Sequence, residues 1–494
     1  MLDSHAPHAF RDRARSALAN VKQVAAVAKA TNTISERRAG ALAEVPDWES
    51  WRSRARDIKA HVLENLPEYL EQFEERATAR GVTVHWARDG KAASKIVFDL
   101  AERAGPGPIV KAKSMVTEEI ELNHALEARD YEPLETDLGE RILQLGGQMP
   151  SHIVAPALHL SRDDVADIFV KELGVERTNV PTELTAIARR LLRESFAKAS
   201  LGISGANFGI AETGSILVLE NEGNIRLATS VPKIHVALMG IEKLIPRMAD
   251  LGLYLRLLPR SGTGQRLTVY QSILTGVDDS QEGPEEMHVI LVDNGRADLL
   301  AHPTDRQTLS CIRCGACQNA CPVYRAVGGH AYGAVYGGPI GAILTPHLAK
   351  GEQSAELPYA SSLCSACRDV CPVKIDIPKS LLRLRAQAVN DGRRGRLEKV
   401  GFRAWARTME NPGRYRRFLA TGRMLQGAAI GKGFTSRAVQ RSISPLGAWM
   451  ETRAPRPLAK RSFRELWNDG LSGEGLSKDG PGHANAPTKE VLRG

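Results

Sequence analysis

Seven cysteines between residues 311 and 371 carry the clearest chemistry in this chain. They form two motifs, Cys311-x2-Cys314-x2-Cys317-x3-Cys321-Pro322 and Cys364-x2-Cys367-x3-Cys371-Pro372. In the first spacing, three thiolates hold one iron–sulfur cluster and the fourth reaches a second cluster. A structural zinc site also uses Cys-x2-Cys pairs, but it takes four ligands and rarely uses three evenly spaced cysteines that end in Cys-Pro. The motifs therefore predict iron–sulfur ligands.

The two motifs are unequal, because a full copy of the first would place a cysteine at Ser361. If the motifs exchange ligands as in two-cluster ferredoxins, the first cluster takes Cys311, Cys314, Cys317 and Cys371, and the second takes Cys321, Cys364 and Cys367. Three thiolates leave open a 3Fe-4S cluster, or a 4Fe-4S cluster whose last iron takes Ser361, water, a partner's side chain or a substrate. We expect two 4Fe-4S clusters, with 3Fe-4S as the alternative for the second, and different reduction potentials.

Length, charge and hydropathy bound the class of protein. A chain of 494 residues predicts two or three domains, since one core serves about 100 to 200 residues. No run of about 18 apolar residues occurs, and residues 1–20 lack the apolar centre of a secretion signal, so we expect a cytoplasmic protein without an integral membrane segment. The net charge of +9 suits an acidic partner or an anionic surface, but no nucleic-acid signature accompanies it. No nucleic-acid partner is expected.

The residues before the cysteines predict helices followed by an α/β domain. Apolar residues between Trp51 and Arg80 recur every three or four positions, which predicts an amphipathic helix or a pair of helices. From Val82 on, short apolar strands alternate with helices, which is typical of a mostly parallel sheet. The predicted strands include Val82–Trp86, Ile109–Ala112, Ser151–Ala155, Gly214–Leu219, Ile225–Ala228, Lys233–Leu238, Thr268–Tyr270 and His288–Val292.

These patterns divide the chain into five parts. We predict an N-terminal helical segment at 1–64, an α/β domain at 65–302, a 4Fe-4S ferredoxin-type domain at 303–385, a basic C-terminal domain at 386–472 and a disordered tail at 473–494. The arginines of the C-terminal domain are interpreted as a solvated surface, a docking face for an acidic partner or a peripheral contact with anionic lipid.

The spacer between the motifs is long enough to contain helices. It runs from Pro322 to Leu363, longer than in a compact bacterial ferredoxin. Its segment Tyr336–Leu344 contains three glycines and a proline, which fits backbone packed close to a cluster or an ordinary loop.

The cysteine motifs with this spacer, together with Lys113-Ser-Met-Val-Thr-Glu-Glu-Ile120 and Gly205-Ala-Asn-Phe-Gly-Ile-Ala-Glu-Thr-Gly-Ser215, resemble the lactate utilisation protein B family. The resemblance runs from about residue 20 to residue 470 and includes Phe463-Arg-Glu-Leu-Trp467. It implies a mostly parallel-sheet LUD domain of α/β class, related to the sugar-phosphate isomerase and CoA-transferase fold. An α-helical double-cluster ferredoxin module and a helical C-terminal extension are implied to follow.

The resemblance also implies a function. Members are expected to act with two partner subunits in the oxidation of L-lactate to pyruvate, as the iron–sulfur electron carrier and not as a catalyst alone. Two alternatives remain open at this point. One is a redox-sensing protein that binds a ligand or regulates a partner, and the other is a reductase that uses the three-thiolate cluster.

Outside the cysteine motifs, the α/β domain offers weaker candidates. Glu212 follows a glycine-rich loop and precedes a strand, where it either serves a ligand or only shapes the loop. A strand-to-helix turn places Lys111, Lys113, Ser114 and Thr117 where an anion could bind, although helix capping explains the two hydroxyls equally well. His235 and His288 lie in apolar strands and are predicted to be core residues without a chemical role.

Overall fold

A computed structural model describes residues 9–277, 283–349, 353–392, 396–429, 459 and 461–468. The chain forms two compact units, residues 1–393 and 394–494. The predicted disordered tail at 473–494 lies outside the described residues, and the division into five domains stays a prediction. The predicted helix pair is present as α3 (Trp48–Glu64) and α4 (Leu66–Thr78).

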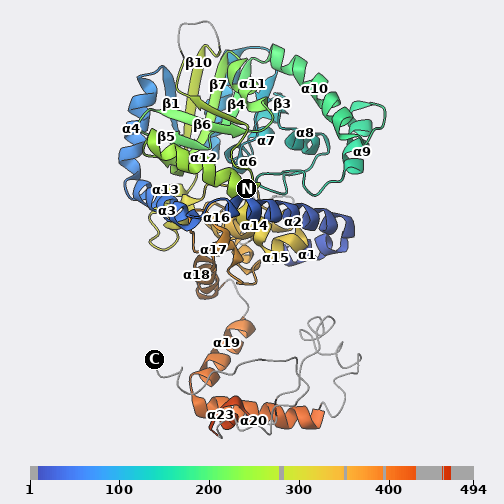
Figure 1. Ribbon diagram of the computed structural model, residues 1–494, viewed down its shortest axis with the longest axis vertical. Helices are drawn as coiled ribbons and strands as arrows, with labels where there is room; N and C mark the ends of the chain where they lie inside the picture. The colour runs from blue at the N-terminus through green and yellow to red at the C-terminus, as the bar shows by residue number, and fades with distance from the viewer. Residues whose placement is uncertain are drawn as a thin grey trace. The chain divides into compact units, whose positions relative to one another are not determined.

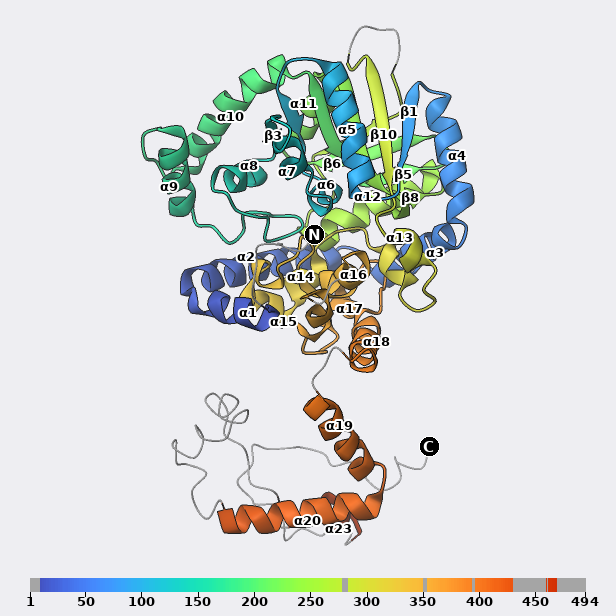
Figure 2. The ribbon, with the colours of Figure 1, turned by 180° about the vertical axis from the view of Figure 1, so that it is seen from behind.

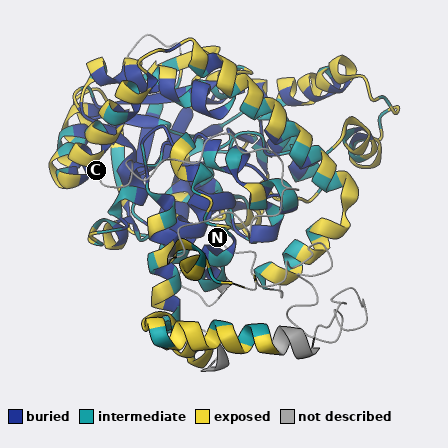
Figure 3. Cartoon of the chain, turned by 60° about the horizontal axis from the view of Figure 1, so that its bottom comes forward, coloured by how far each residue is buried: buried dark blue, intermediate teal, exposed yellow. Residues whose placement is uncertain are grey.

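A six-stranded parallel sheet organises the first unit (Figure 1). Its strands, in spatial order, are β1 (Val82–Ala87), β10 (Glu286–Val292), β7 (Ile234–Gly240), β4 (Leu201–Gly205), β2 (Ile109–Lys111) and β3 (Pro133–Glu135). All five neighbouring pairs are parallel. The central strands are buried on both faces, as parallel strands covered by helices must be, and Figure 3 shows them dark blue. The fold class is therefore the expected one.

Helices and a second sheet cover the two faces of this sheet. On one face, alternate residues such as Ile290 and Val292 pack against α5 (Gly90–Ala104), α6 (Met115–Glu119) and α7 (Leu122–Glu127), which Figure 2 shows from behind. On the other face, Val289 and Leu291 pack against α4 and the second sheet. This alternation places both faces of one strand in hydrophobic cores.

The second sheet has four strands. In spatial order they are β8 (Leu244–Ile245), β5 (Phe208–Ile210), β6 (Ser215–Glu220) and β9 (Tyr270–Leu274). Helix α12 (Met248–Gly262) packs against β8. The remaining helices of the α/β region are α8 (Leu138–Leu145), α9 (Arg162–Leu173), α10 (Pro181–Lys198), α11 (Asn224–Ser230) and α13 (Arg296–Leu300).

The cysteines lie in a module of short helices. These are η2 (Arg306–Ser310), α14 (Ala316–Ala320), α15 (Pro322–Val327), η3 (His330–Tyr332), α16 (Gly338–Leu348), η4 (Gln353–Tyr359), α17 (Ala366–Val370) and α18 (Ile377–Asn390). The N-terminal helices α1 (Phe10–Ala19), α2 (Val21–Ala43) and α3 pack against this module (Figures 1 and 2). One hydrophobic core joins the module to these helices and to the second sheet.

Two predicted strands are wrong, and a third, Thr268–Tyr270, shares only Tyr270 with strand β9. Residues 151–155 form bends, because the ring of His152 accepts the backbone N–H groups of Val154 and Ala155 and so replaces a strand partner. Residues 225–228 belong to helix α11. The carboxylate of Glu220 accepts the first N–H groups of that helix, from Ile225 and Arg226 at 2.7 and 2.8 Å, and so fixes its start.

The second unit is described by three helices, α19 (Arg396–Met409), α20 (Pro412–Ala429) and α23 (Phe463–Asn468). Helices α19 and α20 pack against each other. Phe463 and Trp467 contact each other, and both side chains are exposed. Among the described residues of the whole chain, none of the helices combines the length and the apolar character that a bilayer crossing requires.

Candidate functional site

Four cysteines from both motifs line one cavity. They are Cys311, Cys314, Cys317 and Cys371. Cys371 joins the other three because helix α17, which precedes it, packs against α14, which carries Cys317. The remaining walls are mostly apolar, and Ile153, Ile340 and Ile375 are among them. The structure therefore assembles the four-cysteine set that ligand exchange predicts.

The other three cysteines form a second group. Cys321 and Cys367 are buried, Cys364 is exposed, and the three thiols interact electrostatically. Ser361 is half-buried, and its hydroxyl oxygen accepts the backbone N–H of Leu363 at 3.1 Å. These interactions bring the three cysteines near one another, and Cys367 also interacts with Cys317 of the first group, so the assignment of ligands to a second cluster stays a prediction.

Backbone amides point at the sulfur atoms of both groups. Arg313 N–H donates to Cys311 Sγ and Ile375 N–H donates to Cys371 Sγ, each at 3.4 Å. Backbone N–H groups also bond Cys314, Cys321 and Cys367. These bonds stabilise sulfur in its negatively charged form, which is the form that binds metal.

The second motif repeats the local backbone of the first. Gly315 precedes α14 with φ +76° and Ser365 precedes α17 with φ +67°, so both residues are left-handed. Arg313 is also left-handed, at φ +59°. A side chain in this region costs about 1 kcal/mol or more, and such residues persist where the surroundings determine the conformation.

Burial makes the free thiols poor acids. It raises the pKa of Cys314 and of Cys367 to about 12 and that of Cys371 to about 11, and the neighbouring thiols add to the effect. Thiolates in these places therefore need a positively charged partner. Four cysteine sulfur atoms around one apolar cavity, with backbone N–H groups donating to them, are a donor set that fits an iron–sulfur cluster.

Basic residues of the N-terminal helices surround the first group. Arg52 donates to the carbonyl oxygens of Cys371 and Arg368 at 2.9 and 3.2 Å, and Arg38 donates to that of Val370 at 3.2 Å. Both guanidinium groups lower the pKa of a cysteine of this group. The N-terminal helices therefore contribute positive charge next to the predicted first cluster.

A buried ionic network joins the cysteine loop to the α/β domain. Arg296 bonds Glu119 at 2.8 and 2.9 Å and Glu242 at 2.6 Å. Tyr336 donates to Glu119 at 2.7 Å, and the guanidinium of Arg313 lies 4.6 Å from the centre of the Tyr336 ring. Burial opposes ionisation, but the arginines outweigh it and lower the pKa of Glu242 to about 2. Arg313, between two cysteines, is thus anchored to the α/β domain.

A larger cavity of about 280 Å³ lies next to the first cysteine group. Its walls come from the segments after β2 and β4, from β6, from the end of α12 and from the module residues Arg313 and Tyr336. Ile153 and Arg313 line both this cavity and the cavity of the four cysteines. The α/β domain therefore presents a pocket directly beside the predicted first cluster.

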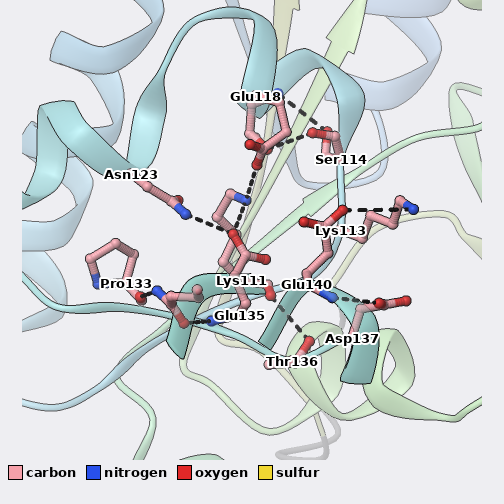
Figure 4. Close-up of polar contacts among 12 residues, drawn as sticks. Lys111, Lys113, Ser114, Glu118, Asn123, Pro133, Glu135, Thr136, Asp137 and Glu140 are labelled. Atoms are coloured by element: carbon pink, nitrogen blue, oxygen red, sulfur yellow. Dashed lines mark hydrogen bonds and ion pairs between the residues drawn. The ribbon is translucent and has the colours of Figure 1, made fainter. Parts of the chain in front are cut away.

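The candidate anion site at the turn after β2 is only partly present. Lys111 is buried and bonds Glu118 and Glu135 at 2.9 and 2.5 Å (Figure 4). Burial alone would lower the pKa of Lys111, but these two carboxylates raise it. Lys111 is thus neutralised inside the protein. The Ser114 hydroxyl accepts the Thr117 N–H at 3.5 Å, which is the capping alternative.

Lys113 differs from Lys111, because it lines the larger cavity. Figure 4 shows its amine extending away from the Lys111 group, toward the carboxyl group of Glu140 at 3.6 Å. Lys113 is the residue of the predicted anion site that remains available to a ligand.

Glu212 and the two strand histidines have structural roles. The exposed Glu212 accepts the N–H of Met248 at 2.7 Å and so caps α12, which supports the interpretation that it shapes the domain. His235 is buried and bonds the Ser204 hydroxyl at 2.8 Å. His288 is buried and bonds His85 and Glu286 at 3.0 and 2.9 Å, so both histidines are satisfied core residues as predicted.

Sequence reasoning missed the basic residues around the sites. Arg38, Arg52, Lys243 and Arg313 were not predicted, although Arg313 lies inside the first motif. The available signal was a charged residue on the buried face of an amphipathic helix, which Arg52 and Lys59 show in α3.

Comparison with known proteins assigns three consecutive regions. Family models match the LUD domain at residues 70–292, the 4Fe-4S dicluster domain at 307–375 and the lactate utilisation protein B C-terminal region at 384–470. A solved DUF162 family protein from Deinococcus radiodurans is 16% identical, covers 46% of this chain and 98% of its own, and has a TM-score of 0.24, on which no argument rests.

Curated relatives align over nearly the whole chain. Lactate utilization protein B of Bacillus thuringiensis (strain Al Hakam) is 41% identical over 466 residues, which cover 94% of this chain and 98% of the relative. The protein of the same name from Bacillus cereus (strain AH187) gives the same values. The chain therefore belongs to the lactate utilisation protein B family.

Proposed function

We propose that this protein carries electrons through two iron–sulfur clusters during the oxidation of L-lactate to pyruvate. The carrying observation is the convergence of Cys371 with Cys311, Cys314 and Cys317 on one cavity, beside a separate group of three cysteines. The match to a 4Fe-4S dicluster domain supports the cofactor, and the names of the relatives support the pathway.

The residues of the chain would hold and tune this cofactor. Cys311, Cys314, Cys317 and Cys371 would bind the first cluster, and Cys321, Cys364 and Cys367 the second. A 4Fe-4S cluster accepts and releases one electron reversibly. The backbone amides stabilise the thiolates, the apolar walls exclude water, and the guanidinium of Arg52 adds positive charge at Cys371. Each of these factors sets a reduction potential.

Electron carriage implies that the chemistry on lactate occurs elsewhere. We infer that partner subunits, two in number by family resemblance, take the electrons from lactate. The isolated chain is then expected to show no lactate turnover, whereas adding the partner proteins and lactate should reduce its clusters. Turnover of lactate by the pure chain alone would contradict this division of labour.

The ligand sets can be tested one at a time by substitution. Anaerobically purified protein should contain iron and sulfide for two clusters and show two electron paramagnetic resonance signals on reduction. Cys314→Ala should remove or alter one signal, and Cys367→Ala should remove or alter the other, because the two residues belong to different groups. Iron and sulfide counting on each variant checks the same assignment.

Ser361→Ala is the matched control for the second cluster. It should leave the first signal unchanged, and a change in the second would identify the serine hydroxyl as its fourth ligand. Zinc in place of iron, or loss of the same signal in both cysteine variants, would contradict the proposed ligand sets.

The geometry does not favour the reductase alternative. That alternative needs a substrate at the three-thiolate cluster, but the large cavity reaches the four-cysteine group through Arg313 and Ile153. A substrate-dependent change in the spectrum of the second cluster would support the reductase alternative.

A further inference from the structure

The large cavity is lined by three basic side chains that are incompletely paired. Lys243 is 6% exposed and makes no hydrogen bond or ion pair with any described residue. The side chain of Arg313 is 9% exposed, and its Nη1 has no hydrogen-bond partner in the described part of the chain. The same holds for Nζ of Lys113. Arg313 Nη2 lies 3.5 Å from a carboxylate oxygen of Glu242, so Arg313 and Lys113 are partly paired and Lys243 is the least paired of the three. Burying charged groups that are incompletely paired is costly, so their gathering around one cavity needs an explanation.

The acidic groups of the cavity do not neutralise them. Glu220 accepts the N–H groups of Ile225 and Arg226 at 2.7 and 2.8 Å. Asp137 and Glu222 each accept a backbone N–H of α8 at 3.0 and 3.2 Å. These carboxylates are therefore used in part by the backbone of the protein itself.

Glu140 is the acid that pairs with Lys113, but it is a weak counter-ion. Its carboxyl oxygen lies 3.6 Å from Nζ, beyond hydrogen-bonding distance. Burial raises the pKa of Glu140 to about 8, which weakens it as a counter-ion for Lys113. Burial likewise lowers the pKa of Lys243 to about 7, and a bound anion would offset that cost.

The walls of the cavity indicate what kind of anion fits. Beside the basic groups, it is lined by the apolar side chains of Val154, Val218, Leu219, Ile225, Leu238 and Leu258. Its volume of about 280 Å³ lies just below the usual range for small-molecule sites, about 300 to 1,000 Å³, which restricts it to a small ligand. Asp137, Glu220 and Glu222 also line the cavity, and their negative charge disfavours a doubly charged anion such as phosphate more than a singly charged one. A short organic acid, with one charge and an aliphatic part, matches these walls.

We propose that this cavity binds a small organic carboxylate, held by Lys113, Lys243 and Arg313 next to the first cysteine group. Arg313 provides the link, since its side chain lines the cavity and its backbone N–H bonds Cys311 Sγ. The evidence for the binding site is the cavity and the residues that line it. A role of this site in sensing or in substrate binding beside a redox centre rests on the proposed function.

Calorimetric titration of the full-length, anaerobically purified protein tests the site. The probes are L-lactate and pyruvate, with neutral lactamide and inorganic phosphate as comparisons. One or both carboxylates should bind, and lactamide and phosphate should bind at least tenfold more weakly. Lys243→Met should weaken carboxylate binding by about 10- to 100-fold, because a charge-assisted hydrogen bond is lost.

Melting temperature and affinity together distinguish a lysine that stabilises the fold from a lysine that binds the ligand. Because Lys243 is buried without a partner, Lys243→Met should leave the melting temperature unchanged or raise it while binding is lost. Arg313→Met provides a second variant, and Lys95→Met on the exposed face of α5 is the matched control that should keep wild-type affinity. A lowered melting temperature with unchanged affinity would assign Lys243 a structural role and overturn the proposal.

The remaining outcomes separate the two proposals. Failure of both carboxylates to bind, equal affinity for lactamide, or tighter binding of phosphate would overturn the carboxylate site. Iron counted in the same preparations distinguishes the causes: iron-free protein that binds carboxylate contradicts the clusters and keeps the site, and iron-loaded protein that does not bind contradicts the site and keeps the clusters.

Discussion

At the scale of single residues, the site depends on groups that the cysteine motifs do not reveal. The motif spacing predicts which thiols lie together, because the last cysteine of such a motif characteristically binds the cluster of the other motif. It says nothing of Arg52, which reaches the carbonyl oxygen of Cys371 from helix α3. Such contacts join residues far apart in the sequence, and their partners are set by packing, which no local pattern encodes.

Arg52→Gln should lower the reduction potential of the first cluster by on the order of tens of millivolts, because positive charge near a cluster favours its reduced form. Burial raises the pKa of Cys371, and the nearby guanidinium of Arg52, which donates to the carbonyl oxygen of Cys371 at 2.9 Å, opposes that rise. A redox titration followed by electron paramagnetic resonance measures the shift, with the second cluster as an internal reference.

Arg52→Lys keeps the charge and should move the potential much less, and Arg56→Gln, on the exposed surface of the same helix, should leave it unchanged. An equal shift in both clusters, or none in Arg52→Gln, would show that the charge of Arg52 does not act on the first cluster.

At the scale of elements, hydrophobic patterning predicts the main sheet but not its shortest strands or the short helix at residues 225–228. The buried strands β7 and β10 are visible as apolar runs, since both of their faces lie in cores. Short strands such as β3 and β8, of three and two residues, carry too little pattern to be found. Residues 225–228 read as a strand, yet the Glu220 carboxylate makes them a helix. Tertiary contacts decide such short segments.

Strand β7 carries a buried neutral histidine that makes stability depend on pH. Burial lowers the pKa of His235 to about 3, while an unfolded histidine keeps a value near 6.5. Below pH 6.5 the unfolded state therefore takes up a proton that the folded state does not, and stability falls by about 1.4 kcal/mol per pH unit for this group. His235→Gln should reduce this slope by about one proton between pH 6 and pH 4.5.

Urea unfolding of both proteins at several pH values measures the slope, and comparing variant with wild type cancels the pH effects of the clusters. His61→Gln, on the exposed side of α3, is the control and should keep the wild-type slope. An unchanged slope in His235→Gln would mean that His235 is already protonated in the folded protein.

At the scale of the whole molecule, all residues of both proposed sites lie in the first unit. The seven cysteines, the surrounding arginines and the walls of the large cavity fall within residues 1–393. One core joins the cysteine module with α2, α3 and the second sheet, so the N-terminal helices act as part of the cluster housing. The sequence predicts these helices but not what they cover, because an amphipathic face does not identify its partner.

A chain ended after Gly392 should therefore fold and keep the iron content and both resonance signals of the full protein. A chain ended after Asp376 is the matched comparison, because it also loses α18. Arg385 of that helix donates to the carbonyl oxygens of Pro358 and Ser361, each at 2.9 Å, and so holds the segment before Cys364. The shorter chain should lose the second signal first. Loss of iron from the chain ended at Gly392 would show that the cluster housing extends into the second unit.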